Sequence, residues 1–232
     1  MTAAGMDVER VYWNFYRVPR WSAAELSDGG GPFGFDITTA LEVDYLIAKY
    51  RCDAVLETGC NVGDTTYYLG RTYPKLKVVT CDVKPEYTAA VAKRCAELPN
   101  VTVEALDSRQ MLERWADKFE RPLFYLDAHW YEDWPLEGEL EHIRRGVVMI
   151  DDFDIGHPRF GFDSYGGKTC GPAMLAPFKP RIGKLYTNNP DGQYELPCLQ
   201  VGRRGGKGYF TVGLEADHFA ANPRYFTRRE IP

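Results

Sequence analysis

Short apolar runs alternate with amphipathic stretches through the middle of the chain. The apolar runs at residues 53–58, 77–82, 122–127 and 146–151 end in a polar residue and predict strands, and the alternating residues 101–105 predict a further strand. The amphipathic stretches predict helices at residues 38–50, 64–73, 85–97, 108–118 and 136–144. Five nearly unbroken apolar strands that alternate with helices favour a parallel sheet with helices on both faces.

The pattern changes after residue 155. Residues 156–171 are rich in glycine and aromatic residues without a clear period, which is typical of a functional loop or lid, and a short helix follows at 172–178. Residues 196–201 and 209–214 predict a hairpin. Its turn is expected to expose three basic residues: Arg203, Arg204 and Lys207.

The first 35 residues are also aromatic and glycine-rich, and they lack a strand pattern. We expect them to form a cover or a dimer arm. The predicted organisation is therefore an N-terminal arm or cover at 1–36 and one domain at 37–232. Residues 156–190 would be a substrate loop or lid inserted into that domain.

An acidic residue lies at the end of each predicted strand. Ligands of open parallel sheets bind beyond the carboxyl ends of the strands, where these side chains would gather. The five acids are Glu57, Asp82, Asp107, Asp127 and Asp151.

The link between the first strand and its helix, residues 57–63, reads E-T-G-C-N-V-G. Glycines allow a sharp turn and a close approach to a ligand. A dinucleotide fingerprint would be G-x-G-x-x-G, but Asn61 stands where it needs its second glycine. The spacing E-x-G-x-x-x-G instead resembles the first motif of class I S-adenosylmethionine-dependent methyltransferases.

That resemblance covers about residues 40–215 and implies a fold and a donor site. The fold would be α/β, a Rossmann-like, mostly parallel seven-stranded sheet with helices on both faces and an antiparallel C-terminal hairpin. In this family an acid at Asp82 accepts hydrogen bonds from the ribose hydroxyls, and residues at Asp107 and Ser108 contact the adenine amino group. The donor-binding residues implied are Glu57, Gly59, Asn61, Gly63, Asp82, Asp107, Ser108 and Asp127.

A second acidic group follows the fourth and fifth strands. Adjacent strands would bring Asp127 close to Asp151 and Asp152, and three carboxylates repel one another unless a cation compensates. The arrangement resembles the metal-dependent O-methyltransferases of the catechol and macrocin types, which implies Mg²⁺ at these three residues. The alternative is that one or two of them cap helices or bind substrate directly.

The resemblance also requires a group that takes the proton of the acceptor. His129, two residues past Asp127, is the first candidate and His157 the second. His129 is alternatively a metal ligand or a structural histidine. The catechol branch has a lysine base shortly after this aspartate, whereas this chain has Trp130 and Tyr131 there and so departs from that branch.

Composition narrows the class of protein. The chain has 232 residues and a net charge of −5, and it lacks an aromatic N-P-P-Y or D-P-P-Y motif, which argues against a nucleic-acid substrate. Its six cysteines include no C-x-x-C pair and are expected to be reduced. There is no secretory signal and no apolar run of membrane length, so we expect a cytoplasmic protein.

The predicted function is therefore an S-adenosylmethionine-dependent O-methyltransferase that needs Mg²⁺ and acts on a hydroxyl of a small molecule, such as a sugar or another natural product. Its aromatic N-terminal arm hints at a homodimer. Two alternatives stay open. One is a metal-independent methyltransferase acting on nitrogen or carbon, and the other is a non-catalytic domain that binds the same donor.

Overall fold

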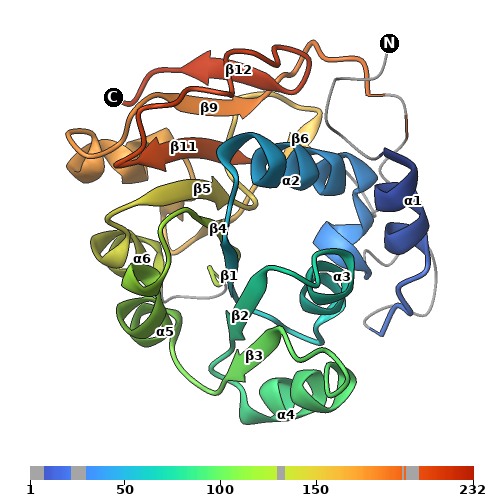
Figure 1. Cartoon of the computed structure of the whole chain (residues 1–232). Helices are drawn as coiled ribbons and strands as arrows, with labels where there is room; N and C mark the ends of the chain where they lie inside the picture. Colours follow the sequence, from blue (N-terminus) through green and yellow to red (C-terminus); the bar gives the residue numbers. More distant parts are fainter. Residues whose placement is uncertain (1–7, 22–29, 130–133, 195, 197–203) are drawn as a thin grey trace.

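An eight-stranded sheet forms the centre of the molecule (Figure 1). The computed structural model describes residues 8–21, 30–129, 134–194, 196 and 204–232. The strands follow the order β12-β9-β11-β5-β4-β1-β2-β3 across the sheet. Their bounds are β1 Ala54–Thr58, β2 Lys77–Cys81, β3 Val101–Glu104, β4 Pro122–Leu126, β5 Gly146–Ile150, β9 Leu185–Asn188, β11 Gly208–Val212 and β12 Phe226–Arg229.

Strands β1 to β5 are parallel, as the alternating pattern predicts. Strand β11 runs antiparallel between β5 and β9, and β12 is antiparallel to β9. The mostly parallel sheet with antiparallel C-terminal strands is confirmed, with eight strands where seven were expected.

The expected hairpin has different partners. Its second strand is β11, which pairs with β5 and β9, and residues 197–203 of its first strand lie outside the described residues. Strand β9 was not predicted, because L-Y-T-N is short and half polar and carries no alternation that the pattern can detect.

Helices cover both faces of the sheet, α2 and α3 on one side and α5 and α6 on the other, while α4 lies beside β3 (Figure 1). The bounds agree with the predicted helices to within three residues, except that α1 was not expected. They are α1 Val8–Tyr16, α2 Ile37–Tyr50, α3 Asp64–Thr72, α4 Pro85–Arg94, α5 Ser108–Trp115 and α6 Leu136–His142, with 3₁₀ turns η2 Pro32–Phe35, η3 Ala116–Lys118 and η4 Pro172–Phe178.

Two hydrophobic clusters, one on each face of the sheet, hold these layers together. Side chains of successive strand residues point to opposite faces, so Leu123 and Tyr125 of β4 enter one cluster and Phe124 and Leu126 the other. All four are at most 2% exposed. This two-sided burial explains why the strand reads as an unbroken apolar run.

The N-terminal segment shares the core of the domain. Helix α1 packs on α2 and α3, with Val11 and Phe15 fully buried in the same cluster as the sheet residues. Trp13 and Tyr16 on the same helix are about half exposed, as is Trp21. These are among the aromatic residues on which the homodimer expectation rests.

The predicted insertion divides into two parts. Residues 156–178 form β6 (Phe160–Gly161), which pairs with β10 (Arg204–Gly205), the β7–β8 pair (Ser164–Tyr165 and Lys168–Thr169) and η4. Strand β9, which also lies within 156–190, belongs to the main sheet.

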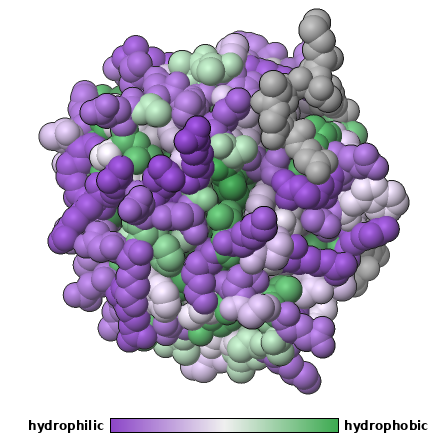
Figure 2. All heavy atoms as spheres, viewed as in Figure 1, coloured by the Kyte–Doolittle hydropathy of each residue, from purple (hydrophilic) through white to green (hydrophobic). Residues whose placement is uncertain are grey.

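The face of the molecule in Figure 2 is mainly hydrophilic, with hydrophobic residues in scattered patches. Apolar helix faces are instead turned toward the sheet. Among the described residues, no helix has the length and apolar character that crossing a membrane requires.

Candidate active site at the carboxyl end of the sheet

A cavity of about 630 Å³ lies beyond the carboxyl ends of the parallel strands. All five predicted strand-end acids line it, from Glu57 on β1 to Asp151 after β5. The remaining residues that the sequence assigned to the donor also line it: Gly59, Asn61, Gly63 and Ser108. The structure thus gathers the predicted donor-binding residues in one place.

The glycine-rich turn between β1 and α3 forms part of the wall. Gly59 has φ +77°, and a Cβ at this position would lie 2.6 Å from the backbone oxygen of Asp127. Asn61 adopts φ 48°, a left-handed conformation that asparagine tolerates better than most residues. Position 61 therefore turns the chain without the glycine of a dinucleotide fingerprint.

The buried carboxyl group of Glu57 connects the elements on either side of this turn. Its Oε2 accepts hydrogen bonds from the hydroxyls of Thr66 and Thr80, the latter at 2.7 Å. Burial raises the pKa of Glu57 to about 7. The carboxyl group thus connects the start of α3 to β2.

Asp82 is oriented by the backbone around it. Its Oδ2 accepts a hydrogen bond from the Asn61 amide at 3.0 Å, and its Oδ1 accepts one from the Lys84 amide at 2.9 Å. A carboxylate oxygen accepts more than one hydrogen bond, so both oxygens retain capacity for ligand hydroxyls. This arrangement fits the ribose role that the resemblance implies.

Asp107 has a local partner. It caps α5 through the Arg109 amide at 2.9 Å and forms two further hydrogen bonds with the Arg109 guanidinium. These bonds lower the pKa of the Asp107 carboxyl, although burial opposes them. Ser108, at the first turn of α5, is buried at the cavity wall.

The N-terminal segment closes one side of the cavity. The Gly31 amide donates to Asp64 Oδ2 at 2.7 Å, and the Phe33 amide donates to Thr65 Oγ1 at 2.9 Å. Arg94 forms a buried ion pair with the same Asp64, at 2.6 Å. Four residues of this segment line the cavity: Gly30, Gly31, Phe33 and Gly34. The sequence analysis missed them, although their glycine cluster was a visible signal.

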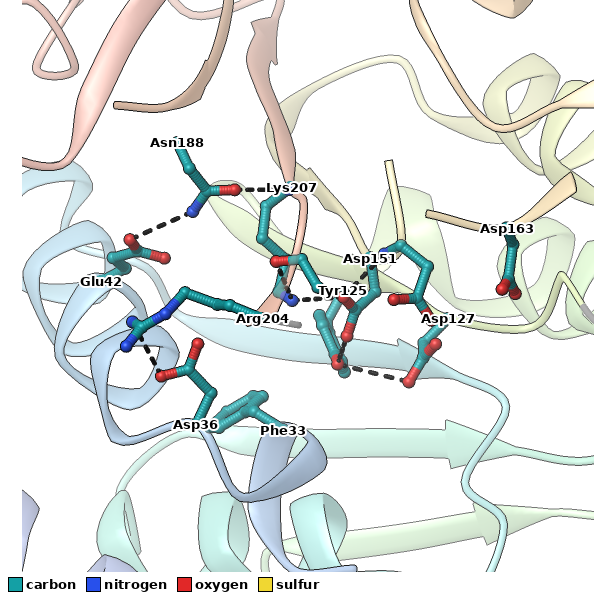
Figure 3. Close-up of polar contacts among 12 residues, drawn as sticks. Phe33, Asp36, Glu42, Tyr125, Asp127, Asp151, Asp163, Asn188, Arg204 and Lys207 are labelled. Carbon is teal, nitrogen blue, oxygen red and sulfur yellow. Dashed lines mark hydrogen bonds and ion pairs between the residues drawn. The ribbon is translucent and has the colours of Figure 1, made fainter. Parts of the chain in front are cut away.

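The other end of the cavity holds the second acidic group (Figure 3). Tyr125 on β4 donates a short hydrogen bond to Asp151 Oδ2 and lies 3.3 Å from Asp127 Oδ2. The Asp127 amide donates to Thr58 Oγ1 at 3.1 Å, which fixes this strand end against β1. Burial and the neighbouring carboxylates raise the pKa of Asp127 well above its usual range.

Lys207 lies inside this group, so its predicted exposure is wrong. The residue is 2% exposed, and its ammonium pairs with Asp151 Oδ1 and donates to the Gly205 carbonyl at 3.2 Å (Figure 3). Arg204 is also mostly buried, 3.0 Å from Asp36, while Arg203 lies outside the described residues. A glycine-rich basic segment predicts an exposed turn, because the local sequence does not indicate that a buried acidic residue will pair with it.

The ion pair with Lys207 changes the pKa of Asp151. Although burial opposes it, the Lys207 ammonium lowers the pKa of Asp151, and the two carboxylates Asp151 and Asp152 raise the pKa of Lys207. Asp152 has no lysine or arginine ion-pair partner among the described residues, and burial together with Asp151 raises its pKa to about 7, although the charge of Lys207 opposes the shift. Asp152 also has φ 45°, a left-handed conformation at the end of β5.

The three predicted metal ligands therefore have different surroundings. Single potential ligand atoms of Asp127, His129 and Asp152 all lie within 4.8 Å of one another. Asp151 is adjacent but is held by Lys207 and Tyr125.

The two candidate proton acceptors lie apart. His129 is 1% exposed beside the carboxylates, and neither of its ring nitrogens has a hydrogen-bond partner in the described part of the chain. Burial lowers the pKa of His129 to about 4, so its imidazole is neutral at pH 7. His157 accepts a hydrogen bond from the Arg159 amide at 3.2 Å in a local turn. Neither histidine is among the residues that line the cavity.

The chain was compared with known proteins. No protein-family model matches it, and no match is found among curated proteins. Solved structures share its fold, and two of them match over most of both chains. One is the N-methyltransferase NodS from Bradyrhizobium japonicum WM9 in complex with S-adenosyl-L-homocysteine, with TM-score 0.54 and 13% identity over 88% of this chain and 99% of that one. The other is a Klebsiella pneumoniae protein assigned as an O-methyltransferase, with TM-score 0.52 and 15% identity over 91% and 93%. The chain thus has the Rossmann-like fold of these proteins.

Proposed function

We propose that this protein transfers a methyl group from S-adenosylmethionine to a hydroxyl of a small molecule, with a divalent cation at the acidic end of its cavity. One observation carries the proposal: the glycine-rich turn and Asp82 share a single cavity with Asp127 and Asp152. A donor site and a group that activates the acceptor would thus be within reach of each other.

The donor half needs hydrogen-bond acceptors for ribose and a close approach of the backbone. Asp82 supplies the first through a carboxylate that two backbone amides already orient. Gly59 supplies the second, because a side chain there would meet Asp127. The cavity is also lined by Val83 and Leu106, apolar residues suited to the faces of an adenine ring. The residues thus fit the donor that the sequence motif implies.

The acceptor half has to bring an oxygen to the donor methyl group. A bond forms between that oxygen and the methyl carbon, the carbon–sulfur bond of the sulfonium breaks with its electron pair going to sulfur, and the hydroxyl proton passes to solvent water. Much of the rate acceleration in such a displacement comes from holding the reacting atoms in line. When bound, a divalent cation lowers the pKa of a hydroxyl and fixes its oxygen. Asp127 and Asp152 would hold this cation. Residues that fix the side chains of these two aspartates would therefore be positioning residues, because they act through the cation ligands and not on the reacting atoms.

The ion pair of Lys207 with Asp151 is the observation that supports the metal-independent alternative, because it already places one positive charge in the group. One positive charge offsets only part of the negative charge of Asp127, Asp151 and Asp152. Asp127 and Asp152 remain without a lysine or arginine partner in the described part of the chain. We therefore prefer the reaction that uses a cation.

Donor binding is the first test. Isothermal titration with S-adenosylhomocysteine should show one site per chain, and Gly59→Ala should abolish or strongly weaken it. The exposed Asp117, which pairs with Arg144 at the surface, provides the control Asp117→Asn, which should bind normally. A wild-type protein that folds but does not bind the donor product would overturn the proposed function.

Turnover is the second test. The protein is incubated with isotopically labelled donor and a panel of small-molecule hydroxyl, amine and carbon acceptors, with and without a chelator. Label should pass to hydroxyl acceptors, stop with chelator and resume when a divalent cation is restored. Transfer to amines that survives the chelator would instead establish the metal-independent alternative.

A further inference from the structure

We propose that the cation site consists of Asp127, His129, Asp152 and Asp163, without Asp151, and that it prefers a first-row transition-metal ion such as Mn²⁺ to Mg²⁺. The inference rests on the proposed function only for the role of the ion in catalysis, because binding itself requires no donor. It changes both the ligands and the metal that the sequence predicts.

The buried imidazole of His129 carries the argument. Its side chain is 1% exposed, and both ring nitrogens are buried without a hydrogen-bond partner among the described residues. Leaving buried polar atoms unpaired is costly, so such atoms call for an explanation. The ring is stacked on Trp134, with centroids 5.9 Å apart and planes 9° from parallel. The stacking on Trp134 therefore fixes the orientation of the ring.

The side chains around this ring are suitable metal ligands. One atom each of Asp127, His129 and Asp152 lie within 4.8 Å of one another, close to the roughly 4 Å that separates opposite ligands at about 2.1 Å from one ion. A fourth group, Asp163, approaches from the insertion. Its Oδ2 is buried without a hydrogen-bond partner and lies 4.0 Å from His129 Nε2.

Asp163 is held at the site by its backbone. Its amide donates to the Asp152 carbonyl at 2.9 Å, and its carbonyl accepts from the Cys170 amide at 3.0 Å. The Trp134 indole that stacks on His129 also donates to the Tyr165 carbonyl at 3.3 Å. In Figure 3, Asp163 lies on the side of Asp127 away from Lys207. The insertion therefore contributes a ligand without needing to move far.

The charges favour the same assignment. Four carboxylates meet here, and Lys207, which forms its ion pair with Asp151, supplies a single positive charge. Asp127, Asp152 and Asp163 have no lysine or arginine partner within the described ranges. A divalent ion at these three residues would compensate charges that the ion pair leaves unbalanced. Because Asp151 already has a cation and a hydrogen bond from Tyr125, it is left out of the ligand set.

The ligand types then select the metal. Oxygen-only sites suit Mg²⁺, whereas imidazole nitrogen suits first-row transition ions. One nitrogen with three carboxylates is a mixed set that Mn²⁺ accepts. The neutral imidazole of His129 would thus be a ligand, and the base role that the sequence suggested for it would be given up.

Electron paramagnetic resonance of added Mn²⁺ tests the proposal directly. Protein without a histidine tag is stripped with chelator and titrated with Mn²⁺, and the loss of the free-ion signal measures binding. Spin-echo modulation from a coordinated ¹⁴N nucleus should appear in the wild-type protein. Mg²⁺ should compete only at about 10-fold excess or more.

Variants then identify the ligands. His129→Gln should remove the nitrogen modulation and weaken Mn²⁺ binding at least about 10-fold. The matched control His157→Gln should keep both. Asp163→Asn should weaken binding by a similar factor, whereas Asp154→Asn, a nearby aspartate in an Asx turn with Gly156, should not. The double variant Asp151→Asn with Lys207→Met removes the ion pair together and should retain Mn²⁺ affinity within about threefold.

Three results would overturn the assignment. These are Mn²⁺ bound without nitrogen modulation, modulation that survives His129→Gln, and an affinity that depends on Asp151 as much as on Asp152. Because the wild-type spectrum alone reports nitrogen coordination, the test does not depend on the variants folding. Failure to bind S-adenosylhomocysteine would count against the proposed function and leave the metal site standing.

Discussion

The ammonium of Lys207 is buried against the carboxylate of Asp151, although the two residues are far apart in the sequence. Asp151 follows β5, and Lys207 immediately precedes β11, the antiparallel neighbour of that strand. The antiparallel register pairs Gly208 with Ile150 and so brings the two side chains together. The C-terminal strands of this sheet therefore determine the charge of the candidate site as well as completing the fold.

Replacing Lys207 by methionine should destabilise the protein by about 3–5 kcal/mol, because the buried carboxylate of Asp151 loses its charged partner. Adding Asp151→Asn should recover a large part of that loss. The free energy of unfolding is measured by denaturant titration of both single variants and the double variant.

Lys184 provides the matched control, since its ion pair with Asp217 has a lysine side chain that is 52% exposed. Lys184→Met should change the free energy of unfolding by no more than about 1 kcal/mol. Equal effects of the two lysine substitutions would mean that the Lys207 pair is solvated and does not shape the site.

The turn after β1 allows a prediction that separates backbone strain from steric contact. Gly59→Ala should destabilise the protein by about 2–5 kcal/mol and abolish donor binding, because the backbone is left-handed and a Cβ would lie 2.6 Å from the Asp127 oxygen. Gly156 has a similar φ of +70° with no atom within 4 Å of its Cβ position. Gly156→Ala should therefore cost only the backbone term, about 1–2 kcal/mol, and leave donor binding intact. Thermal melts and calorimetry measure the two effects, and equal losses of donor binding would refute the role of the close contact.

The fold was largely predictable because burial on both sides gives most of the parallel strands continuous apolar runs, whereas β3 at the edge is only half-buried and alternates. In β5 all five residues, Gly146–Ile150, are buried, and the helix between β4 and β5 begins and ends close to its expected positions. The exceptions lack this signal. Helix α1 is short and has only two buried residues, Val11 and Phe15, and β9 is half polar.

The site was predictable where its residues follow strands. Asp82 and Asp127 lie where a parallel sheet must place the residues after its strands, so position in the pattern is enough. Lys207 reaches the site because β11 pairs with β5. Asp163 reaches it because its amide donates a hydrogen bond to the Asp152 carbonyl. No local period encodes such contacts. A sequence can therefore indicate the acids of this site and still miss their partners.

Asp82→Asn should weaken binding of S-adenosylhomocysteine about 10-fold or more, because hydrogen bonds to a charged acceptor contribute about 1.5–3 kcal/mol each. Folding should be little affected, since the variant amide oxygen still accepts from one of the two backbone amides that now bind Asp82. Calorimetry on the wild type and the variant gives the affinity, with Asp117→Asn as the surface control. Unchanged affinity would remove the end of β2 from the donor site.

The last prediction concerns Glu42, a fully buried carboxyl group on α2. It accepts a hydrogen bond from the Tyr209 hydroxyl at 2.5 Å. It accepts another from the Asn188 side chain at 3.4 Å (Figure 3). Asn188 in turn accepts from the Lys207 amide at 2.6 Å, so this chain of contacts reaches the site. Burial raises the pKa of Glu42 from 4.5 to about 7, although the bond from Tyr209 opposes the shift.

The sign of the pH effect follows from that shift. A group whose pKa is higher in the folded state stabilises the fold at low pH, and this contribution is lost as the pH rises through the folded value. Between pH 5 and 8 the free energy of unfolding of the wild type should therefore fall by about 2–3 kcal/mol more than that of Glu42→Gln. Other buried acids, such as Glu57, have raised pKa values too, so the difference between the two curves isolates Glu42.

Denaturant titrations at half-unit pH steps measure both curves. Glu86→Gln is the control, because this exposed glutamate at the start of α4 keeps its solvation on folding, and its curve should run parallel to the wild type. Parallel curves for Glu42→Gln and the wild type would show that Glu42 is ionised in the fold at every pH tested. In that case its negative charge would have to be compensated by Lys207 and Arg204, whose charges already favour the ionised form.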